Sequence, residues 1–156
     1  MDNFKVCVEK GLLRRVPPST EKAFLSLKRA EEWLVEAEIN LKFGSYRTSL
    51  IASYLAMFHS ARALLFKDGW REKSHFCVAR FLEEFYVKTG KLEQEWVDLL
   101  DRMREIRHAD QYDVSYSPTK DEAEDALRLA KQFVEKIGKL VRGRGFEPRN
   151  PYGRGS

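Results

Sequence analysis

Residues 45–68, SYRTSLIASYLAMFHSARALLFKD, are apolar around nearly the whole circumference of a helix. A helix at the surface of a protein keeps one broad polar face, and this segment has none. Such a helix is covered on several sides by its neighbours. The pair Asp68-Gly69 marks its end, because glycine commonly terminates helices. We therefore expect residues 45–68 to form the central helix of a bundle.

Amphipathic patterns on either side of this segment predict the helices that cover it. In residues 19–43 apolar side chains recur at alternating spacings of four and three, which places them on one helix face. Thr119 and Glu122 have the spacing of a capping box at the start of the last pattern. No stretch alternates apolar and polar residues as a half-buried strand does. The sequence predicts an all-α, up-and-down bundle of four to five long helices. The remaining helical patterns lie at 74–88, 92–109 and 119–141, with room for a short helix in 4–14.

The net charge of +4 is concentrated at the two ends of the chain. It amounts to +2 in residues 1–18, −1 in 19–141 and +3 in 142–156. These ranges are interpreted as an N-terminal extension, the helical bundle and a flexible tail rich in arginine, glycine and proline. The tail is either a non-specific RNA tether or a solubilising end, and both interpretations stay open. A nearly neutral bundle is not the broad basic field of a generic nucleic-acid binder.

Several classes of protein are excluded by composition. Cys7 and Cys77 make neither a metal finger nor a disulfide scaffold, so we expect reduced thiols that pack as small apolar groups. No apolar run approaches the roughly 18–20 residues that span a bilayer, and the N-terminus does not resemble a secretion signal. The three histidines are too scattered for a metal site, and no glycine-rich phosphate loop is present. We expect a cytoplasmic protein with no membrane association, metal or cofactor.

The residues capable of chemistry are concentrated in segment 102–113, RMREIRHADQYD. Arg107 continues the apolar strip of Leu100 and Met103, so its guanidinium needs a partner such as Asp110, a second subunit or a phosphate. The alternative, favoured on the residues alone, is a basic helix end that forms structural ion pairs. Candidate ligand-binding residues in this segment are Arg102, Arg104, Asp110 and Asp113.

The central helix contributes a second polar set, Tyr54, His59 and Arg62. The favoured interpretation is a buried, hydrogen-bonded group in the core. The functional interpretation is a polar pocket that faces segment 102–113 and binds the same ligand. His75 follows Ser74 at an expected helix start, where a capping or surface role is favoured.

Four stretches, in this order, carry a resemblance to a known family that covers about residues 7–141. The chain resembles HEPN-domain proteins of the short, free-standing prokaryotic kind, which are often encoded beside a small nucleotidyltransferase. The stretches are 7–38 with GLLRRVPPS (11–19) and AEEWL (30–34), YLAMFHSARALL (54–65), KSH (73–75) with FYVKTG (85–90), and RHADQYD (107–113).

This resemblance implies a helical bundle that dimerises and, in active members, a metal-independent ribonuclease. The motif of such ribonucleases is an Arg, usually a polar residue next to it, and a His after four to six residues. The Arg stabilises phosphoryl charge, the His exchanges protons, and the RNA 2′-hydroxyl is the nucleophile. With Arg107 as the motif Arg, His108 is the polar residue and Tyr112 occupies the His position. The other register pairs Arg102 with His108.

The candidate catalytic residues are therefore Arg107, His108 and Tyr112. A Tyr, with an unperturbed pKa near 10, is a poor proton shuttle at neutral pH. In relatives with a similar arrangement, the resemblance implies that the nucleotidyltransferase can modify this Tyr. We expect a toxin-like homodimer that binds RNA or a nucleotide, pairs with a nucleotidyltransferase and has a degenerate ribonuclease motif. The alternative is a non-catalytic helical interaction module that acts as an adaptor for a partner protein.

Overall fold

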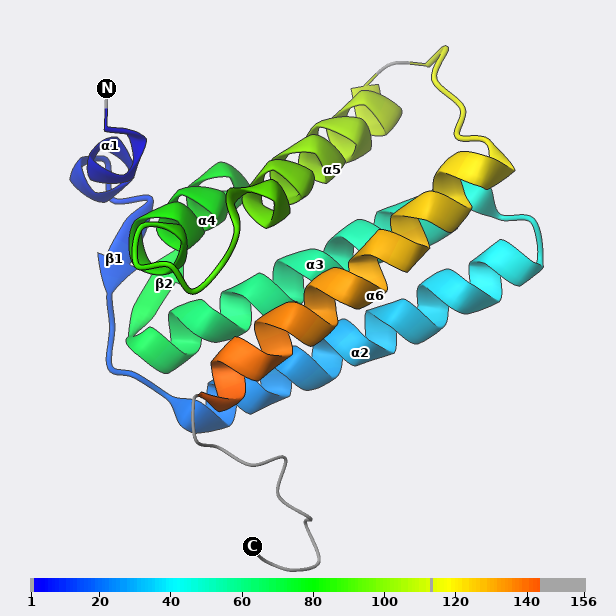
Figure 1. Cartoon of the computed structure of the whole chain (residues 1–156). Coiled ribbons are helices and arrows are strands. Elements are labelled where there is room, and N and C mark those ends of the chain that lie inside the picture. The colour runs from blue at the N-terminus through cyan, green and yellow to red at the C-terminus, as the bar shows by residue number, and fades with distance from the viewer. Residues whose placement is uncertain (1, 113, 144–156) are drawn as a thin grey trace, which may run out of the picture.

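The fold is an all-α bundle, as the sequence predicts. The computed structural model describes residues 2–112 and 114–143, and for residues 110–112 it describes the backbone alone. Three long helices, α2, α3 and α6, lie side by side, while α5 and α4 cover another side of α3 (Figure 1). A short π-helical segment, η1, continues α4. The bounds are α1 Asn3–Glu9, α2 Thr20–Lys42, α3 Tyr46–Asp68, α4 His75–Leu82, η1 Glu83–Val87, α5 Gln94–Tyr112 and α6 Lys120–Arg142.

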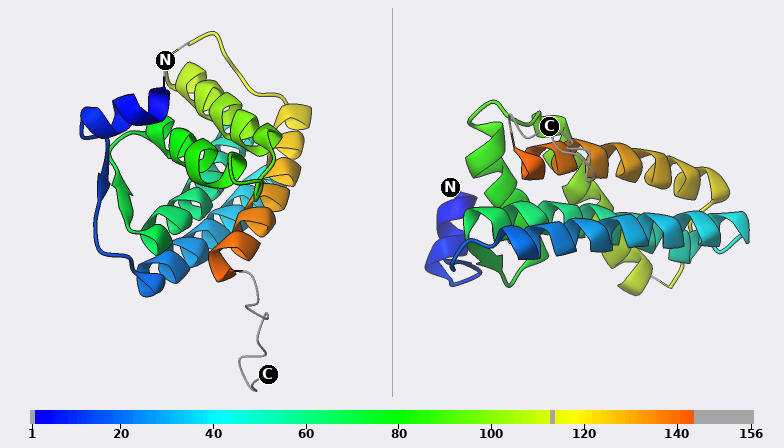
Figure 2. Two further views of the ribbon diagram at one scale, coloured as in Figure 1. Left: turned by 60° about the vertical axis from the view of Figure 1, so that its left-hand side comes forward. Right: turned by 90° about the horizontal axis from the view of Figure 1, so that it is seen from below.

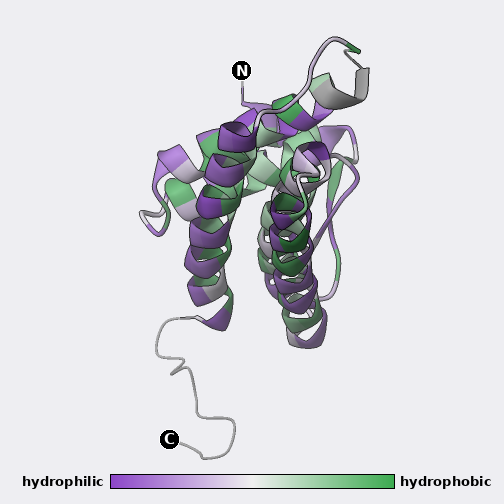
Figure 3. Cartoon of the chain, turned by 90° about the vertical axis from the view of Figure 1, so that its right-hand side faces the viewer, coloured by the Kyte–Doolittle hydropathy of each residue, from purple (hydrophilic) through white to green (hydrophobic). Residues whose placement is uncertain are grey.

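Helix α3 is the centre of the core. Most of its side chains are buried, and it contacts α2, α4, α5 and α6. By length and composition alone α3 could cross a membrane, although the sequence was expected to hold no apolar run of that length. However, 72% of the most apolar stretch of α3 is buried inside the protein. The helices that surround it carry both hydrophilic and hydrophobic residues along their length (Figure 3). Helix α3 is therefore the buried helix of the bundle, as its unbroken apolar surface predicts.

Hydroxyl side chains fix where several helices begin. Ser19 and Ser74 each accept a hydrogen bond from a backbone N–H in the first turn of α2 and α4. Thr119 and Glu122 form the expected capping box of α6, with both reciprocal hydrogen bonds present. These bonds satisfy N–H groups that have no partner within the helix. The cap at Ser74 sets the first residue of α4, which is His75.

The structure contains one small sheet that the sequence did not predict. Strands β1 (Leu13–Arg15) and β2 (Trp70–Glu72) pair antiparallel, with Leu13 opposite Glu72. Strands of three residues are too short to display an alternating pattern, so the sequence contained no signal for them, and the fold remains all-α. Between α3 and β2, Gly69 has a φ of 86°, and a Cβ there would lie 2.7 Å from the Val16 carbonyl oxygen. The pairing holds the N-terminal segment at one end of the bundle (Figure 2).

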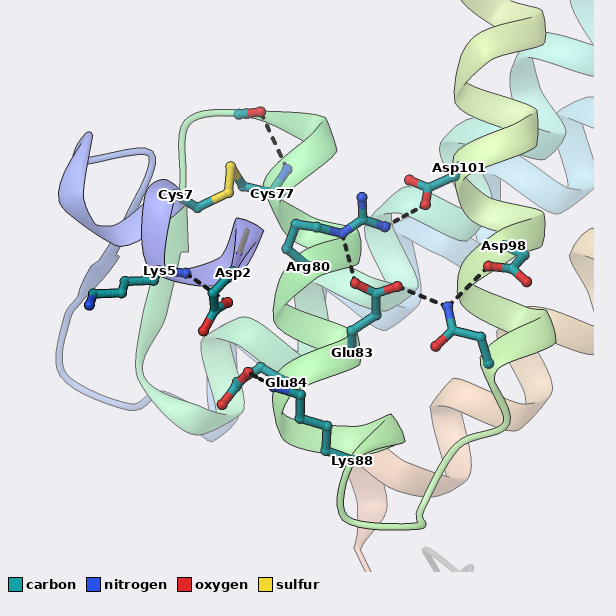
Figure 4. Close-up of polar contacts among 12 residues, drawn as sticks. Asp2, Lys5, Cys7, Cys77, Arg80, Glu83, Glu84, Lys88, Asp98 and Asp101 are labelled. Atoms are coloured by element: carbon teal, nitrogen blue, oxygen red, sulfur yellow. Dashed lines mark hydrogen bonds and ion pairs between the residues drawn. A yellow bond between two sulfur atoms is a disulfide. The ribbon is translucent and has the colours of Figure 1, made fainter.

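The prediction of two reduced cysteines was wrong. Cys7 in α1 and Cys77 in α4 form a disulfide, with the two residues only 2% and 1% exposed. The two cysteines are 70 residues apart in the sequence, so no local sequence pattern predicts the bond. The pairing of β1 with β2 brings α1 beside α4, and the disulfide then joins the two helices (Figure 4).

Candidate functional site

The candidate site lies where α3, the start of α4 and the second half of α5 meet. A cavity of about 350 Å³ opens there, lined by His75, Arg104, Glu105, Arg107 and His108. The structure thus brings together three residues that the sequence singled out, Arg104, Arg107 and His108. It adds His75, which the sequence assigned to a capping or surface role.

His75 is held by two aromatic residues of α3. The Tyr54 hydroxyl and His75 Nδ1 are 2.8 Å apart and share a hydrogen bond. The imidazole ring also stacks on Phe58, with ring centroids 3.9 Å apart and planes at 19°. Because the Ser74 side chain caps α4, the His75 side chain is not needed as a cap and contacts α3 instead. The signal that could have indicated this was the Lys73-Ser74-His75 stretch, one of those that carry the family resemblance.

Arg107 is the cation of this cavity with spare bonding capacity. Its guanidinium lies 5.8 Å from the centroid of the buried Tyr54 ring, within the range of a cation–π contact. Among the side chains that the structure describes, no acidic group forms an ion pair with Arg107. With respect to the described side chains, the guanidinium therefore retains donors for a ligand.

Arg104 is already paired. It binds Asp101 at 2.6 Å, lies 3.8 Å from Glu105 and stacks over Phe76 at 5.3 Å from the ring centroid. Asp101 also binds Arg80 of α4, so a single carboxylate joins α4 to α5 (Figure 4). This network fixes the separation of the two helices that line the cavity. Arg104 contributes positive electrostatic potential to the cavity. Arg107 contributes N–H donors that no described carboxylate occupies.

The other predicted residues occupy different positions. Arg102 is exposed on α5 and does not line the cavity. Helix α5 includes Asp110 and Tyr112, whose side chains are not described, and Asp113 lies outside the described residues. The structure therefore places Tyr112 at the end of α5 and gives no contacts for its phenol.

His59 and Arg62 lie further along α3 from the cavity. Arg62 makes a bidentate pair with Glu72 of β2, with the closest N–O distance 2.9 Å, and Glu72 is only 7% exposed. The His59 carbonyl accepts a hydrogen bond from Ser26 of α2. Neither residue lines the cavity, and Arg62 is engaged in a structural ion pair with Glu72.

Burial determines which protons these groups carry at neutral pH. It raises the pKa of Tyr54 to about 12, although Arg104 and Arg107 act in the opposite direction. Burial, reinforced by Arg107, lowers the pKa of His75. Burial also lowers the pKa of His59 to about 4. Tyr54 is therefore a protonated hydroxyl at neutral pH, and His75 is a neutral imidazole.

A larger groove, of about 990 Å³, lies between α2, α6 and the segment after η1. Its lining combines apolar residues with lysines, glutamates and Arg142, and it includes no histidine and none of the predicted site residues. We therefore locate the candidate chemistry in the smaller cavity. Among the described residues, no group of three His, Cys, Asp or Glu side chains is placed to hold a metal ion.

Comparison with known proteins agrees with this architecture. Residues 24–140 match the HEPN domain. A Methanocaldococcus jannaschii protein with the name "Putative toxin MJ0605" is 31% identical over 113 residues, which cover 72% of this chain and 84% of that protein. A "UPF0332 protein" of Thermotoga maritima is 30% identical over 114 residues, covering 73% of this chain and 86% of the relative. A "UPF0332 protein" of Archaeoglobus fulgidus is 29% identical over 117 residues, covering 75% and 93%.

The match covers most of the bundle, including α3 and the cavity residues of α4 and α5. The chain belongs to the HEPN family. The family resemblance expected from the four sequence stretches is confirmed.

Proposed function

We propose that this HEPN protein is a toxin-like, RNA-binding protein whose α4–α5 cavity receives a phosphate group of the RNA backbone. The observation that carries the proposal is Arg107, which lines the cavity and has no ion pair with a described carboxylate. A planar guanidinium binds phosphate oxygens in a bidentate manner. The half-buried position strengthens the attraction, because the site is less screened by solvent than an exposed arginine.

The toxin-like part of the proposal is supported by relatives. Two M. jannaschii proteins with "Putative toxin" names match this chain at 31% and 28% identity. We extend the proposal to a homodimer in which a second copy brings its own α5 motif, and to a nucleotidyltransferase partner that modifies Tyr112. RNA cleavage would then use the 2′-hydroxyl as nucleophile, with Arg107 stabilising charge on the phosphoryl group.

A non-catalytic adaptor is the second candidate function. It is favoured by one observation, Tyr112 in the position where the ribonuclease motif has its His. An adaptor would bind its partner protein with the same surface and leave RNA intact. Incubation of labelled RNA with the wild type separates the candidates, because cleavage excludes a purely non-catalytic role. RNA binding without cleavage would support an RNA-binding protein that is not a ribonuclease. Absence of RNA binding would favour the adaptor.

We predict that Arg107→Ala weakens RNA binding about tenfold or more, which corresponds to about 1.4 kcal/mol or more for a lost charge-assisted hydrogen bond. Fluorescence anisotropy with a fluorescein-labelled, single-stranded RNA measures the affinity. The matched control is Arg128→Ala, which removes an exposed arginine of α6 that pairs with Asp125. Wild-type affinity in the Arg107 variant would refute the proposed site, and equal weakening in both variants would indicate non-specific charge.

A further inference from the structure

We infer that His75 is a second phosphate-binding residue of this cavity, which donates a hydrogen bond from Nε2, and that Tyr54 is the positioning residue that fixes the proton there. The inference rests on the proposed function, since it concerns the same cavity. It concerns a residue outside segment 102–113, and it assigns to the histidine a role as a donor rather than a base.

The first argument is the orientation of the His75 ring. Its Nδ1 edge faces the Tyr54 hydroxyl at 2.8 Å, and one ring face lies on Phe58. Tyr54 is 1% exposed, so the Nδ1 edge points into the protein. His75 itself is nevertheless only half-buried, and it lines the cavity. Because Nδ1 is turned inward, the part of the ring that is left for the cavity includes Nε2.

The second argument is the direction of the hydrogen bond between Tyr54 and His75. The phenol keeps its proton at neutral pH, and His75 Nδ1 is the hydrogen-bond partner that the structure gives to this buried hydroxyl. A buried hydroxyl that did not donate would leave its proton unsatisfied, which costs about 1–3 kcal/mol. The Tyr54 hydroxyl therefore donates and Nδ1 accepts. A neutral imidazole that accepts at Nδ1 carries its proton on Nε2.

The third argument is the charge of the surroundings. Arg107 and Arg104 line the same cavity as His75, so positive charge and N–H donors surround the cavity. Glu105 is the acidic residue of the lining, and it is exposed and lies against Arg104. Glu72 and Arg62, which also influence His75, neutralise each other in a bidentate pair. A site with donors from an imidazole and a guanidinium selects an anion with several acceptor oxygens, such as a phosphate.

Two substitutions of His75 separate the two ring nitrogens. In His75→Asn the side-chain amide takes the place of Nδ1, so it can still contact Tyr54 but offers no donor at the Nε2 position. In His75→Gln the amide nitrogen reaches the Nε2 position and restores the donor. We predict that the Asn variant binds labelled RNA about fivefold to tenfold more weakly than the wild type, as expected for one lost hydrogen bond to an anion. The Gln variant recovers most of that loss.

Equal losses in both variants would show that His75 has only a structural role, and no loss in the Asn variant would overturn the inference. The outcome is distinguishable from failure of the proposed function. If Arg107→Ala lowers affinity and His75→Asn does not, only the His75 inference fails. If the wild type binds no RNA, the proposed function fails. Titration with AMP and with inorganic phosphate then shows whether a His75-dependent phosphate site exists without RNA.

The protonated nitrogen is measured directly in the folded wild type, so the inference does not depend on variants that fold poorly. A long-range ¹H–¹⁵N correlation spectrum of the ¹⁵N-labelled protein identifies which ring nitrogen of His75 carries the proton. We predict Nε2–H in the wild type and a mixture of tautomers in Tyr54→Phe, which keeps the ring and removes the hydroxyl. A wild-type spectrum with the proton on Nδ1 would overturn the inference, because Nε2 would then be an acceptor.

Discussion

Replacement of both cysteines, as Cys7→Ser with Cys77→Ser, is expected to lower the free energy of unfolding by about 4 kcal/mol. The disulfide closes a loop of 70 residues and so restricts the unfolded chain. It also holds α1 against α4, whose first residue is His75. Urea unfolding followed by circular dichroism measures the change.

The control for this prediction is the wild type in excess reductant, which should unfold at the same urea concentration as the double variant. Because both sulfur atoms are buried, reduction is expected to require partial opening of the protein and to be slow. If the oxidised and reduced wild type unfold at the same urea concentration, the bond makes no contribution to stability. The proposal that the α1–α4 disulfide stabilises the fold would then be refuted.

Glu72→Gln is expected to lower the free energy of unfolding by about 3 kcal/mol, the lower end of the cost of breaking a buried ion pair. Glu72 is 7% exposed and binds both the Nε and an Nη of Arg62. Loss of its charge leaves a partly buried guanidinium without its anion. Arg62 also stacks over Phe58, the ring on which His75 rests. The same urea experiment measures the loss.

A double variant tests this explanation. Arg62→Met with Glu72→Leu removes both charges and leaves apolar side chains of similar size, which is often close to neutral for a buried pair. We expect it to be more stable than Glu72→Gln. If the double variant is less stable than the single one, the ion pair itself, and not the unpaired charge, determines the loss.

The helices could be predicted from the sequence because their information is local. Apolar residues three and four positions apart define one face, and the nearly uniform apolar surface of α3 predicts its central place. The same local logic found Arg107, which continues the apolar strip of its helix and lines the cavity. Local periodicity therefore accounts for the elements and for the side of the site that α5 contributes.

The rest of the site could not be predicted because it depends on contacts between distant segments. His75 and Tyr54 are 21 residues apart and meet only where α4 packs on α3. Cys7 and Cys77 are 70 residues apart and meet because two three-residue strands pair. Arg62 looked like a candidate ligand-binding residue because its partner, Glu72, lies in one of those unexpected strands. In each case the tertiary fold determined the partner.

The salt dependence of RNA binding tests most directly whether Arg107 contacts a phosphate. Each phosphate contact to single-stranded RNA releases counterions and adds about 0.7 to the slope of log affinity against log salt concentration. We predict that Arg107→Ala makes this slope shallower by about 0.7, whereas Arg128→Ala leaves it as in the wild type. An Arg107 variant with the wild-type affinity and the wild-type slope would contradict an RNA phosphate site in the α4–α5 cavity.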